Sequence, residues 1–105
     1  MTAATELAHP DIDDVDLGTM LLALADPHRR RVVLELARDP KTERQCATFA
    51  LPITKSTKTH HWRVLRESGL VYQRAAGNAL YIRLRADDLK RRFPGLLDTI
   101  AALEA

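Results

Sequence analysis

The chain has little cysteine and no long apolar run, and each shortage excludes a class of protein. Its single cysteine, Cys46, cannot form an intrachain disulfide, which excludes the disulfide-rich scaffolds of small secreted proteins. The longest apolar run, residues 20–25, is far too short to span a bilayer, and the N-terminus lacks the pattern of a signal peptide. We therefore expect a cytoplasmic protein with no membrane segment. A length of 105 residues suits a single domain.

Positive charge is missing from the first quarter of the chain. Residues 1–27 hold six acidic residues and neither lysine nor arginine, whereas residues 28–74 hold eleven basic residues against four acidic ones. A basic block of this kind is typical of a surface that binds a polyanion, although a solvated basic face has the same composition. Residues 1–15 show no apolar periodicity, so we expect a flexible acidic tail there and a folded domain over residues 16–105.

Motifs for catalysis are also absent. The sequence contains no glycine-rich phosphate loop, no nucleophile elbow and no paired-carboxylate pattern. Two adjacent histidines, His60 and His61, would point to different sides of a helix. We therefore expect no catalytic residue and no cofactor.

Apolar spacing predicts four helices in the first two thirds of the chain. An apolar stripe at i, i+3, i+4 and i+7 predicts a helix over residues 16–25. Asp26 and Pro27 have the order of an N-cap and a first helical residue, and this second helix ends before Pro40. Residues 42–50 suit a short third helix. A fourth begins near residues 54–56 and ends at Gly69, a typical C′ glycine.

The pattern becomes alternating after Gly69. Residues 70–75 and 79–85 are rich in β-branched and aromatic residues, and Gly77 and Asn78 between them can adopt a positive φ, so we expect a β-hairpin. An apolar stripe over residues 95–104 predicts a last helix. This order predicts a mainly α fold with a small β-hairpin, a winged helix-turn-helix whose helices flank a two-stranded wing.

The fourth predicted helix has two distinct faces. Lys58, His61, Trp62 and Leu65 share a packing stripe, on which His61 is best explained as a core histidine. The opposite stripe is polar and begins at the helix N-terminus, where backbone N–H groups favour phosphate. We expect a DNA-binding surface, read mainly by this helix, of Lys55, Ser56, Thr57, Thr59, His60, Arg63, Arg74 and Asn78. The alternative is a winged-helix module that binds protein, but such a module should expose apolar residues on this stripe.

Three segments resemble the ArsR/SmtB family of winged helix-turn-helix regulators over about residues 17–103. They are LADPHRRRVVLEL (24–36), STKTHHWRVLRESGLV (56–71) and RAAGNALYIRL (74–84). Asn78 stands where the family usually carries an arginine after the wing glycine. The resemblance implies a homodimeric repressor of transcription that binds double-stranded DNA and assembles through its terminal helices. The expected dimer contacts are the apolar residues of those helices: Leu17, Met20, Leu21, Leu24, Leu96, Leu97, Ile100 and Leu103.

Many members of that family sense metals, but the ligand sets of the family are incomplete here. Cys46 is the only thiol where the family has several, and residues 87–105 contain carboxylates but no histidine. We therefore expect no metal site. A metal-responsive repressor with a non-standard site that includes His9 is the remaining alternative. No residue pattern identifies a small-molecule effector.

Overall fold

The computed structural model describes residues 7–104, which form five α-helices and one small sheet. The α-helices are α1 (Leu17–Ala25), α2 (Pro27–Ala37), α3 (Lys55–Glu67), α4 (Ala86–Arg92) and α5 (Leu96–Leu103). The strands are β1 (Arg44–Gln45), β2 (Val71–Ala76) and β3 (Ala79–Leu84), and two 3-10 helices are η1 (Ile12–Asp14) and η2 (Cys46–Thr48). Strand order is β1–β3–β2, all antiparallel. This confirms the winged helix-turn-helix, with a short third strand added to the predicted wing.

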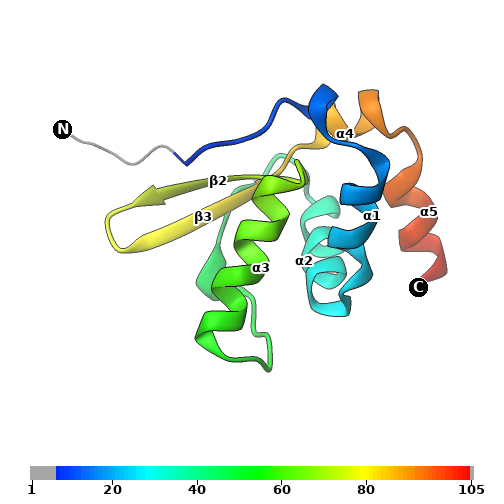
Figure 1. Cartoon of the computed structure of the whole chain (residues 1–105). Helices are drawn as coiled ribbons and strands as arrows, with labels where there is room; N and C mark the ends of the chain where they lie inside the picture. The colour runs from blue at the N-terminus through cyan, green and yellow to red at the C-terminus, as the bar shows by residue number, and fades with distance from the viewer. Residues whose placement is uncertain (1–6, 105) are drawn as a thin grey trace.

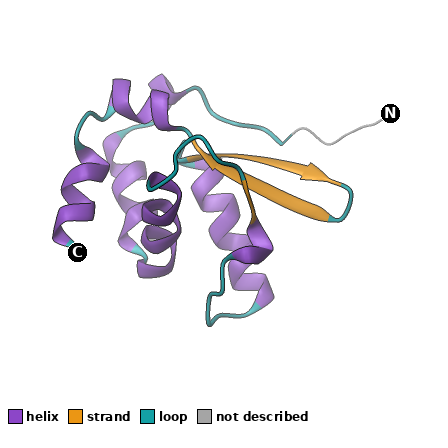
Figure 2. Cartoon of the chain, turned by 180° about the vertical axis from the view of Figure 1, so that it is seen from behind, coloured by secondary structure: helices purple, strands orange, loops and turns teal. Residues whose placement is uncertain are grey.

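The wing and the C-terminal helix lie at opposite ends of the molecule. Figure 1 shows the β2–β3 hairpin projecting away from the helices, beside α3, while α5 packs at the far side of α2. The view from behind shows the same separation (Figure 2). Across residues 7–104, no helix is long and apolar enough to cross a membrane.

The first two helices begin where the sequence predicts. Asp16 caps α1, and Asp26 caps α2 by accepting hydrogen bonds from two backbone N–H groups of the first turn, at 2.8 and 3.1 Å. Pro27 follows as the first residue of α2, a position whose N–H would have no helical partner. The two helices contact each other through fully buried side chains: Met20, Ala23, Leu24, Val32, Val33 and Leu36.

The prediction of a helix over residues 42–50 is wrong. Arg44 and Gln45 instead form β1 and pair with β3. One 3-10 turn follows, in which the backbone N–H of Phe49 donates to the carbonyl of Cys46 at 3.2 Å, and both of these side chains are buried. Pairing with a strand far along the chain therefore overrides a local pattern that suits a helix.

The wing hairpin forms as predicted, but its turn differs in one residue. The register runs from Val71 opposite Leu84 to Ala76 opposite Ala79, which leaves a two-residue turn. Gly77 has a φ of +60°, whereas Asn78 does not have a positive φ, so that part of the prediction is wrong. A positive φ at the first turn residue alone fits a type II′ turn rather than type I′.

Residues 7–15 differ from the flexible tail that the sequence predicts. Ile12 and Val15 are 2% and 5% exposed and belong to the hydrophobic core. The buried guanidinium of Arg85 donates to the carbonyl of Pro10 at 2.8 Å, which ties this segment to the end of β3. Two apolar residues without helical or strand periodicity gave no signal that the segment packs. The rest of the predicted tail, residues 1–6, lies outside the described residues.

The C-terminal region contains two helices where the sequence predicts one. α5 matches the predicted helix, and α4 precedes it, separated by Pro94 and by Gly95 at a φ of +79°. Basic residues in the last turn of α4 face the carbonyl end of that helix, where positive charge is favourable.

Candidate nucleic-acid interface

Both ends of α3 are fixed by local sequence. Thr54 is the N-cap, and its hydroxyl accepts a hydrogen bond from the backbone N–H of Thr57 at 3.2 Å. At the other end Gly69 has a φ of +82°, and the backbone N–H of Leu70 donates to the carbonyl of Leu65 at 3.1 Å. This is the Schellman arrangement that the C′ glycine predicts. The helix therefore starts and stops at defined residues.

The polar stripe of α3 faces solvent as the helical spacing predicts. Ser56, Thr59, His60 and Arg63 are all exposed, and so is Lys55 at the N-terminus. Thr57 is half-buried because it lies against the N-cap, where its hydroxyl accepts from that of Thr54 at 2.9 Å. The exposed groups are ammonium, hydroxyl, imidazole and guanidinium. The hydroxyl of Thr59 donates to the carbonyl of Lys55 at 3.1 Å and so is left as an acceptor. These groups project from a rigid helix that carries no exposed large apolar side chain on this stripe.

The packing stripe anchors α3 to the rest of the domain. His61, Trp62 and Leu65 are 4%, 6% and 0% exposed, which confirms His61 as a buried histidine. The ring of Trp62 lies 5.9 Å from that of Phe49, which follows η2. Lys58 is half-buried, as expected for a lysine whose stem lies along the edge of the core. The helix is thus held by contacts along its length.

Arg29 of α2 links three helices, a role that no sequence pattern predicts. Its Nε and Nη2 donate to the carbonyls of Ala23 and Leu22 at 2.8 and 3.1 Å, at the C-terminal end of α1. Its Nη1 lies 3.1 Å from Nδ1 of His61 on α3. A guanidinium can only donate, so Nδ1 accepts and the imidazole proton is on Nε2. An arginine among three consecutive arginines carries no sequence signal for this role.

The protonation of His61 is set by the same contacts. Burial lowers the pKa of His61, and this effect outweighs the opposing carboxylate of Asp26, whose Oδ1 is 3.6 Å from Nε2. Burial raises the pKa of Asp26, but the backbone N–H of Arg29, the neighbouring His61 and the backbone N–H of His28 together bring it below its ordinary value. A neutral His61 beside an ionised Asp26 is therefore the favoured state at neutral pH.

The wing presents its cations on the face away from α3. Side chains alternate along β2 and β3, so Gln73, Ile82 and Leu84 point inward and are buried. We call the opposite side the outer wing face; it consists of Tyr72, Arg74, Tyr81 and Arg83. Each arginine lies over a tyrosine ring, with Arg74 4.6 Å from the ring centre of Tyr81 and Arg83 4.9 Å from that of Tyr72. Asn78 is exposed at the turn.

Arg74 has a second partner that no local sequence pattern indicates. Glu43, just before β1, accepts hydrogen bonds from Nε and Nη2 of Arg74 at 2.8 and 2.7 Å. Hydrogen bonding to Arg74 lowers the pKa of the Glu43 carboxyl despite partial burial. The predicted wing contact is exposed, but it is already held by an acidic residue.

The expected dimer surface divides into core and exposed residues. Met20 and Leu24 are 0% and 4% exposed within the protomer, so their prediction as partner contacts is wrong. Leu17, Leu21 and Leu103 are 52%, 47% and 80% exposed. Leu22, which lies off the predicted stripe, is 72% exposed and lines a hollow with His60 and Val64 of α3. Three further residues are partly buried against the core: Leu96, Leu97 and Ile100.

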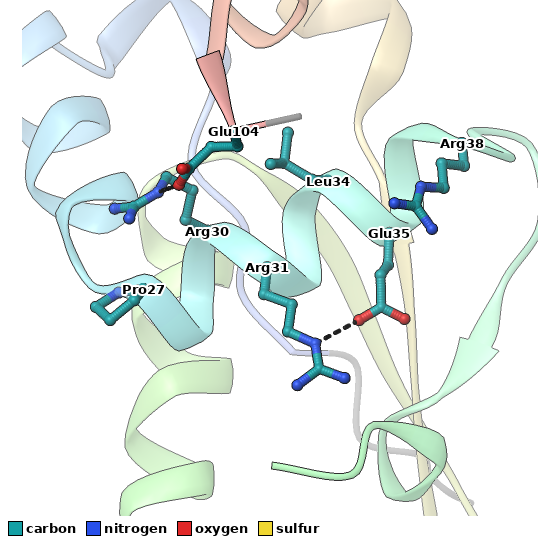
Figure 3. A pocket seen from close by; sticks show the side chains of 7 residues that line it. All are labelled: Pro27, Arg30, Arg31, Leu34, Glu35, Arg38 and Glu104. Atoms are coloured by element: carbon teal, nitrogen blue, oxygen red, sulfur yellow. Dashed lines mark hydrogen bonds and ion pairs between the residues drawn. The ribbon is translucent and has the colours of Figure 1, made fainter. Parts of the chain in front are cut away.

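A hollow of about 420 Å³ lies on α2, beside the end of the chain. Three arginines line it, but Figure 3 shows that Arg30, Arg31 and Arg38 point in different directions. Arg30 pairs with Glu104, and Nε of Arg31 pairs with Glu35 at 3.1 Å. The three guanidinium groups therefore do not face a common position at which one anion could bind.

The described residues contain no cluster of three or more histidine, cysteine or acidic side chains able to hold a metal ion. Burial raises the pKa of Cys46 to about 12, so its thiol stays protonated at neutral pH. His9, the alternative ligand, instead accepts a hydrogen bond from the backbone N–H of Gln73 at 2.9 Å through Nε2.

Comparisons with known proteins place this arrangement in a family. A family model described as a helix-turn-helix domain matches residues 24–74. The uncharacterized HTH-type transcriptional regulator YceK of Bacillus subtilis (strain 168) is 31% identical over 90 residues, which cover 84% of this chain and 89% of that protein. A crystal structure of an ArsR family transcriptional regulator is similar, with a TM-score of 0.64 at 21% identity over 85% of this chain and 91% of that one. The chain belongs to the ArsR-like helix-turn-helix regulators.

A second solved structure agrees with the assignment to the ArsR-like regulators. The crystal structure of a possible transcriptional regulator for arsenical resistance is 32% identical, with a TM-score of 0.58, over 83% of this chain and 96% of that one. These relatives are transcriptional regulators and not enzymes, which confirms the expectation that the chain is no enzyme.

Proposed function

We propose that this ArsR-like regulator is a homodimeric repressor that reads an inverted repeat in double-stranded DNA through α3. The observation that carries the proposal is the exposed stripe of Ser56, Thr59, His60 and Arg63 on a helix fixed at both ends. Major-groove reading requires hydrogen-bonding groups of this kind on a rigid helix. We infer a cytoplasmic location as well, because the similar regulator YceK comes from Bacillus subtilis, a bacterium, in which duplex DNA lies in the cytoplasm.

The N-terminal end of α3 suits phosphate, and its middle suits bases. Lys55, Ser56 and Thr57 lie in the first turn, where the helix dipole favours an anion. The backbone N–H of Thr57 is taken by the N-cap, whereas those of Lys55 and Ser56 have no partner within the described residues. Thr59 and His60 come next on the exposed side, followed by Arg63 one turn later. We infer that Thr59 and His60 set sequence preference. Arg63 contributes the largest share of affinity, through either a guanine edge or a phosphate.

Exposed leucines on the two terminal helices support two-fold assembly. Leu17 and Leu21 on α1 and Leu103 on α5 are left in solvent by the protomer, and a second copy would cover them. Leu22 is also exposed but lies beside His60 and Val64 of α3. A dimer of this kind would place two α3 helices about 34 Å apart and so select half-sites one helical turn apart.

The experiment that tests DNA reading is selection of duplexes from a random library, followed by footprinting. We expect protection of an inverted repeat, and loss of that protection in the triple variant Thr59→Ala, His60→Ala, Arg63→Ala. Circular dichroism would check that the variant folds. Intact binding by the folded triple variant would remove α3 as the reader, and the protein-binding module would replace this function.

Sedimentation tests the assembly. We expect wild-type protein to be a dimer at micromolar concentration and Leu21→Asp or Leu103→Asp to shift it to monomer. Leu80→Asp is the matched control, because Leu80 is also exposed but lies on the wing. A wild-type monomer, or an unchanged dimer in both variants, would contradict assembly through this surface.

A further inference from the structure

A carboxylate occupies the donor edge of the arginine nearest the wing tip. Nε and Nη2 of Arg74 both donate to Glu43, at 2.8 and 2.7 Å, so one whole edge of the guanidinium is used. Tyr81 lies beneath the guanidinium, 4.6 Å away at its ring centre, and limits its rotation. Two-point pairs of this kind are the strongest arginine–carboxylate contacts.

Two other exposed ion pairs of the domain use a single hydrogen bond each. Nη1 of Arg91 contacts Asp13 at 3.0 Å, and Nε of Arg31 contacts Glu35 at 3.1 Å, through one hydrogen bond each. The Arg74 contact differs from both, because it has two hydrogen bonds to separate carboxylate oxygens and an aromatic platform. Arg85 also makes two hydrogen bonds, to Asp88, and lies over Tyr72, but its guanidinium is buried.

The position of the pair gives it a consequence for DNA binding. Residues 75–79 of the hairpin are alanine, glycine and asparagine, so Arg74 is the charged residue closest to the tip. A phosphate, like a carboxylate, is bound best by two adjacent N–H groups of a guanidinium. Glu43 therefore competes with a DNA phosphate for the Nε–Nη2 edge and leaves only the Nη1 end of the guanidinium open. The negative charge of Glu43 also opposes the approach of the backbone.

We propose that Glu43 is a positioning residue that withholds Arg74 from DNA phosphates and thereby lowers the sequence-independent affinity of the wing. This inference rests on the proposed function, because it concerns the affinity of the regulator for duplex DNA. Sequence-independent binding comes almost entirely from phosphate contacts. When Arg74 is paired with Glu43, the wing adds little sequence-independent affinity, and the base contacts of α3 decide which DNA sequence is bound. Glu43 therefore raises the ratio of operator affinity to random-sequence affinity.

The test compares binding of folded, full-length variants to the selected operator and to a random-sequence duplex over a range of salt. Glu43→Gln keeps the size of the side chain and removes its charge. Asp13→Asn is the matched control, since it removes one charge from an exposed arginine–carboxylate pair on η1. The double variant Glu43→Gln, Arg74→Ala asks whether the effect acts through Arg74.

We expect Glu43→Gln to tighten binding to the random duplex by about two- to fivefold, the range for freeing a cation from an exposed pair. The salt dependence should steepen by about one phosphate contact per protomer, and the operator-to-random ratio should fall. Asp13→Asn should change little, and the double variant should lose the gain.

Unchanged or weaker binding of Glu43→Gln to the random-sequence duplex would overturn the inference. An equal gain in affinity in the double variant Glu43→Gln, Arg74→Ala would overturn it too. Either result leaves the proposed function standing if wild-type protein still protects an operator. Failure of wild-type protein to bind any duplex would instead remove the proposed function, and this inference with it.

Discussion

The α3 stripe and the outer wing face both expose arginine, yet they differ in what those arginines already contact. Within residues 7–104, the side chain of Arg63 on α3 takes part in no ion pair, whereas Arg74 on the wing is held by two hydrogen bonds and a tyrosine ring. Exposure alone therefore does not measure how available a cation is. The free N–H donors decide which surface can bind a new anion without first losing a partner.

The two surfaces also differ in how they are supported. α3 is capped at both ends and pinned through His61 to Arg29, which in turn binds the end of α1. The wing is a two-stranded hairpin beyond the point where β1 joins it. A reading surface needs its side chains held in place by their support, so the comparison favours α3 for base reading and the wing for an adjustable backbone contact.

The largest expected effect separates Arg63 from Arg74. Arg63→Ala should weaken operator binding by about 1–3 kcal/mol if Arg63 reads a guanine edge, with relaxed preference at one base pair. Arg74→Ala should cost at most about 1 kcal/mol, because its ion pair already limits its contribution. Fluorescence anisotropy with operator and single-base variants measures both.

The salt dependence resolves which contact Arg63 makes. A phosphate contact would weaken all sequences alike and lower the salt slope by about one per site. If Arg74→Ala weakened operator binding more than Arg63→Ala, the ion-paired arginine would contribute more than the unpaired one. That result would contradict the conclusion that an existing ion pair makes an arginine less available to DNA.

A smaller effect is expected from the turn of the wing. Gly77 has a φ of +60°, and no atom lies within 4 Å of a Cβ placed there, so the cost of Gly77→Ala is conformational and about 1 kcal/mol. Asn78→Ala is the matched control, because Asn78 needs no positive φ. Thermal unfolding should show the loss for Gly77→Ala alone. If the wing does not read sequence, the base preference of both variants should match that of wild type.

A pH dependence should reveal the support of α3. His61 has a pKa below its ordinary value of 6.5 in the folded protein, chiefly because it is buried. Below pH 6.5 the imidazole of His61 becomes protonated in the unfolded chain but stays neutral in the folded protein. The free energy of unfolding therefore decreases as the pH drops below about 6.5 and is retained above it.

Urea unfolding from pH 7.5 to 5 measures this dependence. His61→Gln keeps an acceptor for Arg29 without titrating, so its stability should fall less over that range. His60→Gln, an exposed neighbour on the same helix, should retain the wild-type decline. An identical decline in His61→Gln would show that other groups cause it.

Sequence alone predicted the features that local chemistry determines. The caps at Asp26 and Gly69, the two faces of α3 and the hairpin all follow from nearest-neighbour patterns, and the structure agrees with them. The failures share a cause. Within residues 42–50, Arg44 and Gln45 form a strand because of a distant partner. Ile12 and Val15 pack without a periodic pattern. A local window holds no information about either.

The site residues show the same limit. Spacing placed Ser56, Thr59, His60 and Arg63 on one exposed stripe, because helical geometry alone decides it. Arg29, which supports the stripe, and Glu43, which restrains the wing, act through residues 32 and 31 positions away. Side-chain contacts over such separations depend on the finished fold. Met20 and Leu24 of the apolar stripe of α1 were predicted as partner contacts but are buried within the protomer. Periodicity identifies a packing face without saying whether the protomer or a partner covers it.

We expect no effect of metal ions on DNA binding, either through the α3 stripe or through the outer wing face. Zinc, cadmium, nickel and arsenite need several soft or imidazole ligands, whereas Cys46 is a lone buried thiol whose pKa is raised to about 12 by burial. The described residues offer no alternative cluster. Stoichiometric metal should therefore leave operator affinity and its salt slope unchanged for wild-type protein, and Cys46→Ser should behave in the same way. Release of operator by one of these metals would reveal a ligand set completed by residues 1–6 or by a partner protomer. A His9→Gln variant that lost the response would then identify the first ligand.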